Sequence, residues 1–153
     1  SNLRLGRPEA TDEELWESLR VAQADFVEDL DMLIAQGGTN VSGGQRQRLS
    51  IARMLVARPL VYLFDDSFSA LDVATDAKVR AAMRASFAER EQPVTSIIVA
   101  QRVASIRDAD QILVLDAGRI VDRGTHEELL DRCAVYQEIV DSQETAAAAG
   151  GEN

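Results

Sequence analysis

Groups suited to binding a phosphate are concentrated at the start of the segment 40–72. Ser42 offers a hydroxyl, Gly43 and Gly44 offer unobstructed backbone N–H groups, and Gln45 offers an amide. At the start of a helix this combination favours an anion, because the first N–H groups lack partners within the helix and the helix dipole is positive there. A structural glycine turn is the alternative interpretation.

A helix and a strand must position these groups. Apolar residues at helical spacing predict a helix that begins at Ser42 and is closed by Pro59: Leu49, Ala52, Leu55 and Val56. The apolar run 60–64 predicts a strand buried on both faces of a parallel sheet, with Asp65 and Asp66 at its carboxyl end, where open α/β sheets bind ligands. Asp65 suits Mg²⁺ held through water, because Mg²⁺ uses few carboxylates together with waters and phosphates. The alternative is an aspartate that caps the next turn.

A second buried strand is predicted at residues 95–100, which are β-branched and apolar, and Gln101 follows its end. A helix from Asp72 to about Arg90 supplies the crossover that parallel strands need. We therefore expect Asp65 and Gln101 at the same edge of one sheet.

Helices are also predicted before this segment. Residues 1–10 are expected to form a loop, and Thr11 begins a helix in capping-box form whose apolar stripe extends to Phe26. A second short helix is expected at 26–33, ended by the two glycines at 37–38.

The C-terminal residues predict a hairpin followed by helices. Strands are expected at 112–116 and 119–122, joined by a tight turn. A capping box at Thr125 begins a short helix with His126 at the surface of its first turn; a terminal helix follows, and residues 146–153 are expected to fray. Cys133 is interpreted as ordinary helix packing.

Composition excludes several classes of protein. The 153 residues have the length of one domain, and 26 acidic against 16 basic residues give a net charge of −10, which disfavours nucleic acid as a partner. No apolar run approaches the roughly 20 residues of a membrane span, and no signal-peptide layout is present. The single cysteine fits a reducing cytosol.

These motifs resemble those of the ATP-binding-cassette (ABC) ATPases. Residues 42–48 are similar to the family's signature motif and residues 60–65 to its Walker B strand, and a D-loop follows in the expected order: Ser69, Ala70, Leu71 and Asp72. The resemblance covers nearly the whole chain, and residues 99–130 resemble the exporter-type transporters most.

The resemblance implies an α/β fold, namely the C-terminal half of a nucleotide-binding domain. It implies a helical subdomain with the signature helix at 1–58, part of a P-loop NTPase (RecA-like) core at 59–132, and a terminal helix and tail at 133–153. Without the other half of the core, apolar surface is expected on the sheet.

The resemblance also implies a function. In this family ATP and Mg²⁺ lie between two nucleotide-binding domains, and one domain's signature motif faces the γ-phosphate held by the other. The implied partners are a second such domain and transmembrane domains, at the cytoplasmic side of the cell membrane. Because these residues contain no G-x-x-x-x-G-K-[ST] sequence, the chain alone is not expected to hold ATP in the usual way.

Three positions depart from the family pattern. Asp66 stands where a catalytic glutamate is usual, and its shorter carboxylate is expected to impair general-base work. Gln101 stands where a switch histidine is usual; it can hydrogen-bond a phosphate but cannot carry a proton. Gln36 stands where exporters often have an acidic residue that contacts the transmembrane coupling helices. With an intact signature and D-loop, we interpret the chain as the degenerate half of a heterodimeric exporter.

Two alternatives stay open from the sequence. One is a homodimeric exporter that turns over slowly through Asp66. The other is a non-transport cassette ATPase acting in DNA repair or translation, or a regulatory interaction module, which the exporter-like residues 94–130 and the acidic composition disfavour. The exported substrate is not indicated.

Overall fold

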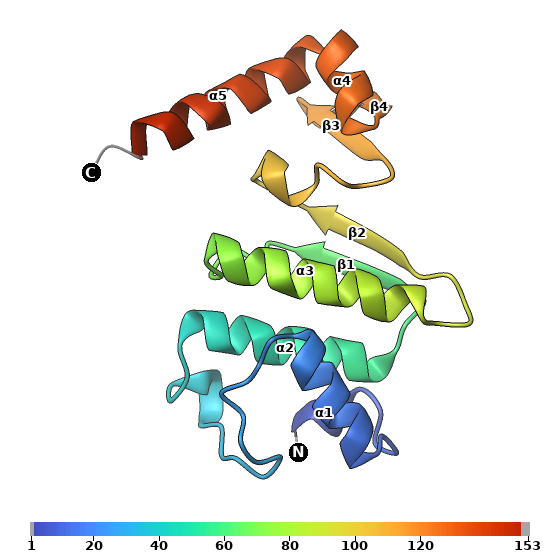
Figure 1. Cartoon of the computed structure of the whole chain (residues 1–153), viewed down its shortest axis with the longest axis vertical. Helices are drawn as coiled ribbons and strands as arrows, with labels where there is room; N and C mark the ends of the chain where they lie inside the picture. The colour runs from blue at the N-terminus through green and yellow to red at the C-terminus, as the bar shows by residue number, and fades with distance from the viewer. Residues whose placement is uncertain (1, 151–153) are drawn as a thin grey trace. The chain divides into compact units, whose positions relative to one another are not determined.

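The computed structural model describes residues 2–150, which form two compact units divided between Val99 and Ala100. Both units mix helices and strands, so the predicted α/β class is confirmed (Figure 1). The first unit contains η1 (Asn2–Leu5), α1 (Asp12–Val21), η2 (Gln36–Gly38), α2 (Gly43–Ala57), β1 (Val61–Asp65), α3 (Val73–Ala88) and β2 (Thr95–Val99). The second contains η3 (Val103–Ser105), β3 (Ile112–Asp116), β4 (Arg119–Gly124), α4 (His126–Arg132) and α5 (Ala134–Gly150).

Helix α1 is shorter than its apolar pattern predicts, because it ends in a cap that contains no glycine. Thr11 begins it in the predicted capping box with Glu14. At the other end Gln23 adopts a left-handed φ of 56°, and the N–H of Ala24 donates to the carbonyl of Leu19 (2.8 Å). This is the Schellman arrangement, in which glycine is the usual left-handed residue.

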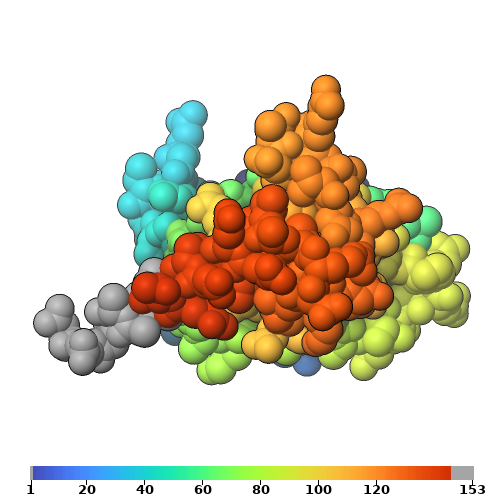
Figure 2. Space-filling view, turned by 90° about the horizontal axis from the view of Figure 1, so that it is seen from above, coloured from blue at the N-terminus to red at the C-terminus, as the bar shows by residue number. Residues whose placement is uncertain are grey.

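The helix predicted at residues 26–33 is wrong. The structure has turns there, and only the short 3₁₀ helix η2 (Gln36–Gly38) precedes α2. The carboxylate of Asp29 accepts the N–H of Asp31 (2.9 Å), and an aspartate that bonds the backbone two residues on favours a turn over a helix. In Figure 2 part of this connection, in light blue to cyan, projects from the surface, and Leu33 within it is 87% exposed.

Helices α2 and α3 begin where the sequence predicts. Ser42 and Asp72 cap them, each accepting a backbone N–H from the first turn of its helix. Helix α2 ends at Arg58, which has a left-handed φ of 51° directly before Pro59. The two helices share one apolar core with α1 and β1, whose most buried members include Leu15, Ala22, Ala52, Val56, Phe64 and Val79. This core fixes α2 and α3 beside β1.

Strands β1 and β2 pair in parallel, as predicted, with α3 as the crossover between them. Their register places Asp65 opposite Val99, so the two carboxyl ends coincide. The end of the strand pair therefore carries the two aspartates that the sequence singled out.

Only one face of β1 is covered. Tyr62 and Phe64 are 2% and 1% exposed, whereas Val61 and Leu63 on the opposite face are 58% and 65% exposed. Strand β2 is exposed along most of its length, with Ile97 at 52%. The expectation of strands buried on both faces is therefore wrong, since no described element covers the second face, and the apolar surface expected on the sheet is confirmed.

The second unit is a β-hairpin packed with two helices. Strands β3 and β4 pair antiparallel around a turn at Ala117 and Gly118, both with positive φ, as two-residue hairpin turns of this type require. Helix α4 begins in the predicted capping box of Thr125 with Glu128. Cys133 is buried at its end, within the core of this unit.

His126 is buried rather than at the surface, which corrects the sequence-based expectation. It is 4% exposed, and its Nδ1 lies 2.9 Å from the hydroxyl of Tyr136 on α5. The two rings meet edge to face with centroids 5.8 Å apart. Helix α5 packs against α4 in this unit and supplies the tyrosine that satisfies the buried ring nitrogen; burial raises the pKa of Tyr136.

Helix α5 continues through Gly150, so the frayed tail expected at 146–153 is wrong for the backbone of its first part. Residues 151–153 lie outside the described residues. None of the helices within residues 2–150 combines the length and apolar character needed to cross a bilayer.

Candidate functional site

The first turn of α2 is built by a reciprocal pair of hydrogen bonds. Ser42 Oγ accepts the N–H of Gln45 (3.2 Å), and the side-chain oxygen of Gln45 accepts the N–H of Ser42 (2.8 Å). The helical ladder begins with Arg46, whose N–H donates to the carbonyl of Ser42 (2.9 Å). The N–H groups of Gly43 and Gly44 precede this ladder and are available to an anion. Because the cap uses the oxygen of Gln45, its amide nitrogen is the atom it can offer to a ligand.

Glycine is suited to positions 43 and 44 for different reasons. A Cβ added at Gly44 would lie 3.0 Å from the carbonyl oxygen of Ala70 and 3.6 Å from the side chain of Leu71, so Gly44 allows close packing on the loop after β1. A Cβ added at Gly43 would meet only the Cβ of Ala70, at an ordinary 3.7 Å, and Gly43 has no positive φ. Packing within this chain thus explains Gly44 but not Gly43, where the lack of a side chain would let a ligand approach the backbone.

The loop between β1 and α3 is folded around the carbonyl of Asp66. Ser69 donates to this oxygen from its Oγ (3.0 Å) and its N–H (3.3 Å), and the side chain of Gln47 on α2 adds a third donor (3.3 Å). Asp66 itself has a left-handed φ of 51°, which aspartate tolerates better than most residues. Such a conformation persists where the surrounding structure holds it, and these three bonds do so.

Gln47 is a residue of this site that the sequence reasoning did not single out. Besides its bond to Asp66, its amide nitrogen donates to Ser69 Oγ (3.1 Å), and its amide oxygen accepts the N–H of Ala70 (2.9 Å). Helix α2 and the loop are therefore tied together through one side chain. The sequence analysis included Gln47 in the signature-like segment 42–48 but predicted no role of its own for it, because its partners lie far along the chain.

Buried side chains hold the same loop from the inside. Phe68 and Leu71 are 5% and 6% exposed, and the rings of Phe68 and Phe64 have centroids 5.2 Å apart. The guanidinium of Arg80 lies 3.9 Å from the centroid of the Phe68 ring and is ion-paired with the buried Asp76. These contacts fix the loop while its polar residues stay at the surface.

Asp72 ends the loop as the N-cap of α3. Its carboxylate accepts the hydroxyl (2.6 Å) and the N–H (2.9 Å) of Thr75. These two bonds, the hydroxyl first, hold the pKa of Asp72 below its ordinary value. In this chain Asp72 therefore has a defined structural task.

The structure brings most of the predicted site residues into one region. Asp65 and Asp66 are exposed at the carboxyl end of β1, next to the loop that contacts the first turn of α2. Gln101 is exposed and follows Val99 by two residues, but it belongs to the second unit. The shared edge holds for the strands, and the closeness of Gln101 to Asp65 stays a prediction.

The donors at this edge suit Mg²⁺ when other ligands complete the set. Among the described residues, no three His, Cys, Asp or Glu side chains form a group that could hold a metal ion. Mg²⁺ at nucleotide sites uses one or two carboxylates with waters and phosphate oxygens, and the exposed carboxylate of Asp65 fits that pattern. The ion would neutralise charge on the phosphate.

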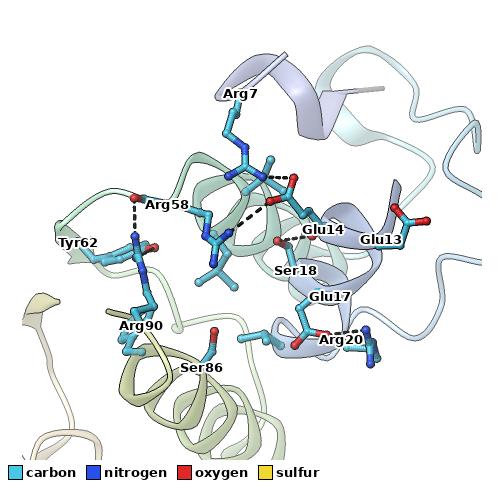
Figure 3. A pocket seen from close by; sticks show the side chains of 14 residues that line it. Arg7, Glu13, Glu14, Glu17, Ser18, Arg20, Arg58, Tyr62, Ser86 and Arg90 are labelled. Atoms are coloured by element: carbon cyan, nitrogen blue, oxygen red, sulfur yellow. Dashed lines mark hydrogen bonds and ion pairs between the residues drawn. The ribbon is translucent and has the colours of Figure 1, made fainter. Parts of the chain in front are cut away.

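A cavity of about 340 Å³ lies at the other end of α2, between the end of that helix, α1 and the end of α3 (Figure 3). Glu14 lies between Arg7 and Arg58, and Arg90 donates to the hydroxyl of Tyr62 (3.2 Å). A backbone hydrogen bond in the cap of α1, followed by the bond to Arg7, lowers the pKa of Glu14. None of the predicted site residues lines the cavity. Ion pairs join arginines and glutamates of its lining: Arg7 and Arg58 to Glu14, and Arg20 to Glu17.

Comparison with known proteins places this fold in a class. The chain matches the structure of a bacterial Atm1-family ABC exporter with ATP bound, with a TM-score of 0.83 and 38% identity over 93% of this chain and 25% of that one. The family described as ABC transporter matches residues 8–69. By fold and sequence, the chain is therefore similar to a part of ABC transporter ATP-binding proteins.

Curated relatives show the same similarity. The chain is 51% identical, over 98% of its length, to an uncharacterised ABC transporter ATP-binding protein of Mycobacterium tuberculosis, covering 26% of it. It is 39% identical over 93% of its length to a protein of Staphylococcus aureus named for multidrug export as an ATP-binding/permease protein, covering 25% of it. The chain thus spans about a quarter of the length of these relatives, and the predicted resemblance to exporter-type proteins is confirmed.

Proposed function

We propose that this chain is part of the nucleotide-binding domain of an ABC exporter and presents the first turn of α2 to ATP held by a second such domain. The observation that carries the proposal is Gly43, a glycine at a helix start capped by Ser42 that neither packing within the chain nor a positive φ requires. The hydroxyl of Ser42 and the N–H groups of the first turn suit the negative charge that develops on a transferred phosphoryl group. In the assembly, ATP binding and hydrolysis would drive transport.

The proposal requires a partner for nucleotide binding. The 153 residues contain no G-x-x-x-x-G-K-[ST] loop, so a partner domain would hold the phosphates together with Mg²⁺. We therefore expect the chain alone to show no measurable ATPase and weak ATP binding. Isothermal titration with Mg-ATP tests this, and micromolar affinity would contradict it.

The chain's own catalytic side is proposed to be weak. Asp66 offers a carboxylate one methylene shorter than the glutamate usual in this family, and Gln101 cannot carry a proton. This asymmetry supports a heterodimer in which the competent site combines the partner's catalytic acid with this chain's Ser42 and Gly43.

The connection between α1 and α2 is proposed to contact transmembrane domains at the cytoplasmic side of the membrane. Three consecutive apolar residues there are exposed, Met32 at 38%, Leu33 at 87% and Ile34 at 39%, close in sequence to Gln36. Exposed apolar clusters on a loop favour a protein contact over a solvent-facing role.

The decisive test compares variants in the full-length protein assembled with its partner. Ser42→Ala should lower ATP turnover about a hundredfold or more, as loss of one donor to developing charge does. Ser50→Ala, at an exposed serine of the same helix, is the matched control and should leave turnover unchanged. Wild-type turnover in Ser42→Ala would contradict the proposal.

The asymmetry has its own test. Asp66→Asn should cost much less than the same change at the partner's corresponding acid, since removing a contribution that is already small changes little. If Asp66→Asn stopped turnover as completely as the partner's variant, this half would be catalytic in its own right.

A further inference from the structure

Gln47 is the residue through which α2 reaches the loop after β1. It lies in the second turn of the helix, and each polar atom of its amide is used: the nitrogen by the carbonyl of Asp66 and by Ser69 Oγ, the oxygen by the N–H of Ala70. With one donor group and one acceptor both engaged, the amide has a single orientation. Its partners lie 19 to 23 residues away in the chain, so the contact is tertiary.

The contact lies where two parts of the proposed site meet. On one side is the turn of Ser42 and Gly43; on the other is the loop of Asp66, whose left-handed φ needs support. The two parts also lie close together at Gly44, where an added Cβ would lie 3.0 Å from the carbonyl oxygen of Ala70. A shift of this loop would therefore move the first turn of α2.

We infer that Gln47 is a positioning residue that holds the Ser42–Gln45 turn in the position needed to contact the phosphate. The inference rests on the proposed function of that turn. Gln47 touches no reacting atom; it acts by fixing the loop, and the loop fixes the helix start. Its bonds are exposed to water, so their contribution is to geometry more than to the free energy of unfolding.

Two substitutions separate the parts of this contact. Gln47→Leu removes the donor and the acceptor. Gln47→Glu keeps an oxygen for the N–H of Ala70 but sets a second oxygen against the carbonyl of Asp66, and a negative charge near a helix start does not destabilise the helix. Gln92→Glu, at an exposed position between α3 and β2, introduces the same charge as a matched control.

The first measurement is hydrogen exchange at the amide of Ala70 in the 153-residue chain. We expect exchange about fivefold faster in Gln47→Leu, since the net strength of one hydrogen bond is lost, and little change in Gln47→Glu or Gln92→Glu. Unchanged exchange in Gln47→Leu would show that the bond does not hold the loop, and would overturn the inference.

The second measurement is ATP turnover in the assembled full-length protein. Gln47→Leu should lower kcat by about ten- to a hundredfold with KM within about twofold, as a small misplacement of a catalytic group does. The loss should not add to that of Ser42→Ala: the double variant should match Ser42→Ala within about twofold, because both changes act on one turn. A lowered melting temperature with unchanged kcat would instead assign Gln47 a purely structural role.

These outcomes keep the two proposals distinct. Brisk wild-type turnover with unchanged kcat in Gln47→Leu, or with fully additive losses in the double variant, overturns the inference and leaves the proposed function standing. A wild-type assembly that does not hydrolyse ATP refutes the proposed function, and the exchange of Ala70 then decides alone whether Gln47 fixes the loop.

Discussion

The two ends of helix α2 use their polar groups in different ways. At the start, Ser42 and Gln47 bond to backbone groups, and the N–H of Gly43 precedes the helical ladder, which begins at Arg46. At the end, Arg58 faces Glu14 and Arg90 bonds to main-chain carbonyls, so the charges are satisfied within the chain. The first-turn N–H groups at the start precede the helical ladder and are the donors that a ligand could use.

This difference distinguishes the proposed binding site from the end of the helix, where the charged groups bond within the chain. The larger hollow is at the end of the helix, where Figure 3 shows arginine and glutamate side chains turned toward one another. The start offers backbone donors at the positive end of the helix dipole. The proposed site thus rests on hydrogen-bonding capacity at a helix start and not on the cavity of Figure 3.

The largest expected effect is at the start of the helix. Gly43→Asp places a carboxylate where the proposed phosphate binds, so turnover in the assembled protein should fall at least about a hundredfold. The fold should be kept, because an acidic residue in the first turn of a helix is favourable and Gly43 has room for a Cβ. Steady-state ATPase with a thermal melt checks both parts. Full turnover in a folded variant would remove the distinction between the two ends.

At the other end, Arg90→Ala should affect stability and not turnover. The side chain donates to the carbonyls of Pro59 and Arg58 and to the hydroxyl of Tyr62, and loss of charged hydrogen bonds costs about 1–3 kcal/mol in the free energy of unfolding. Urea titration measures this, with Lys78→Ala at an exposed position of α3 as the control. A fall in kcat of the folded assembly would extend the functional site to this end.

A matched pair of alanine variants sharpens the comparison within the first turn. Both Gly43→Ala and Gly44→Ala gain helix propensity, but only Gly44→Ala meets a backbone oxygen at 3.0 Å. We expect Gly43→Ala to be more stable than Gly44→Ala by about 1 kcal/mol in denaturant titration. If the two variants were equally stable, the loop could move to accommodate the added methyl group, and α2 would not be tightly packed against it.

The smallest expected effect is on the pH dependence of stability. The pKa values of Glu14 and Asp72 are lowered from 4.5 and 3.8, so both carboxylates favour the folded state when they are charged. That stability is present above the ordinary pKa values and is lost as the pH falls through the lower values of the folded state. Glu14→Gln should therefore show a smaller loss of stability than wild type when acidified below pH 4.5, measured by thermal melts. An unchanged acid response would mean that these bonds contribute nothing.

Local chemistry explains which parts of the fold the sequence predicted correctly. Thr11, Ser42, Asp72 and Thr125 cap helices because each bonds an N–H three residues on, which is visible in the sequence. The parallel strand pair also followed from local patterns, since two apolar runs flank one crossover helix.

The predictions that failed are those in which a residue distant in sequence, or an unusual backbone conformation, determines the local structure. Gln23 ends α1 in a conformation that normally signals itself by a glycine. His126 is buried because its ring nitrogen bonds to the hydroxyl of Tyr136, ten residues later. Val61 is exposed because no described element covers its face of the sheet. In the candidate site, Gln47 was missed for the same reason, because its partners lie 19 to 23 residues ahead in the chain.

The open face of the β1–β2 pair has a practical consequence for anyone who purifies these 153 residues. Val61, Leu63 and Ile97 form apolar surface on two short strands, and apolar strands of this kind invite stacking between molecules. The net charge of −10 opposes stacking in dilute solution at low salt, but salt screens that repulsion. We expect the preparation to precipitate as salt and protein concentration rise, at temperatures well below its melting temperature. The salt concentration of the buffer will therefore limit its storage more than the temperature does.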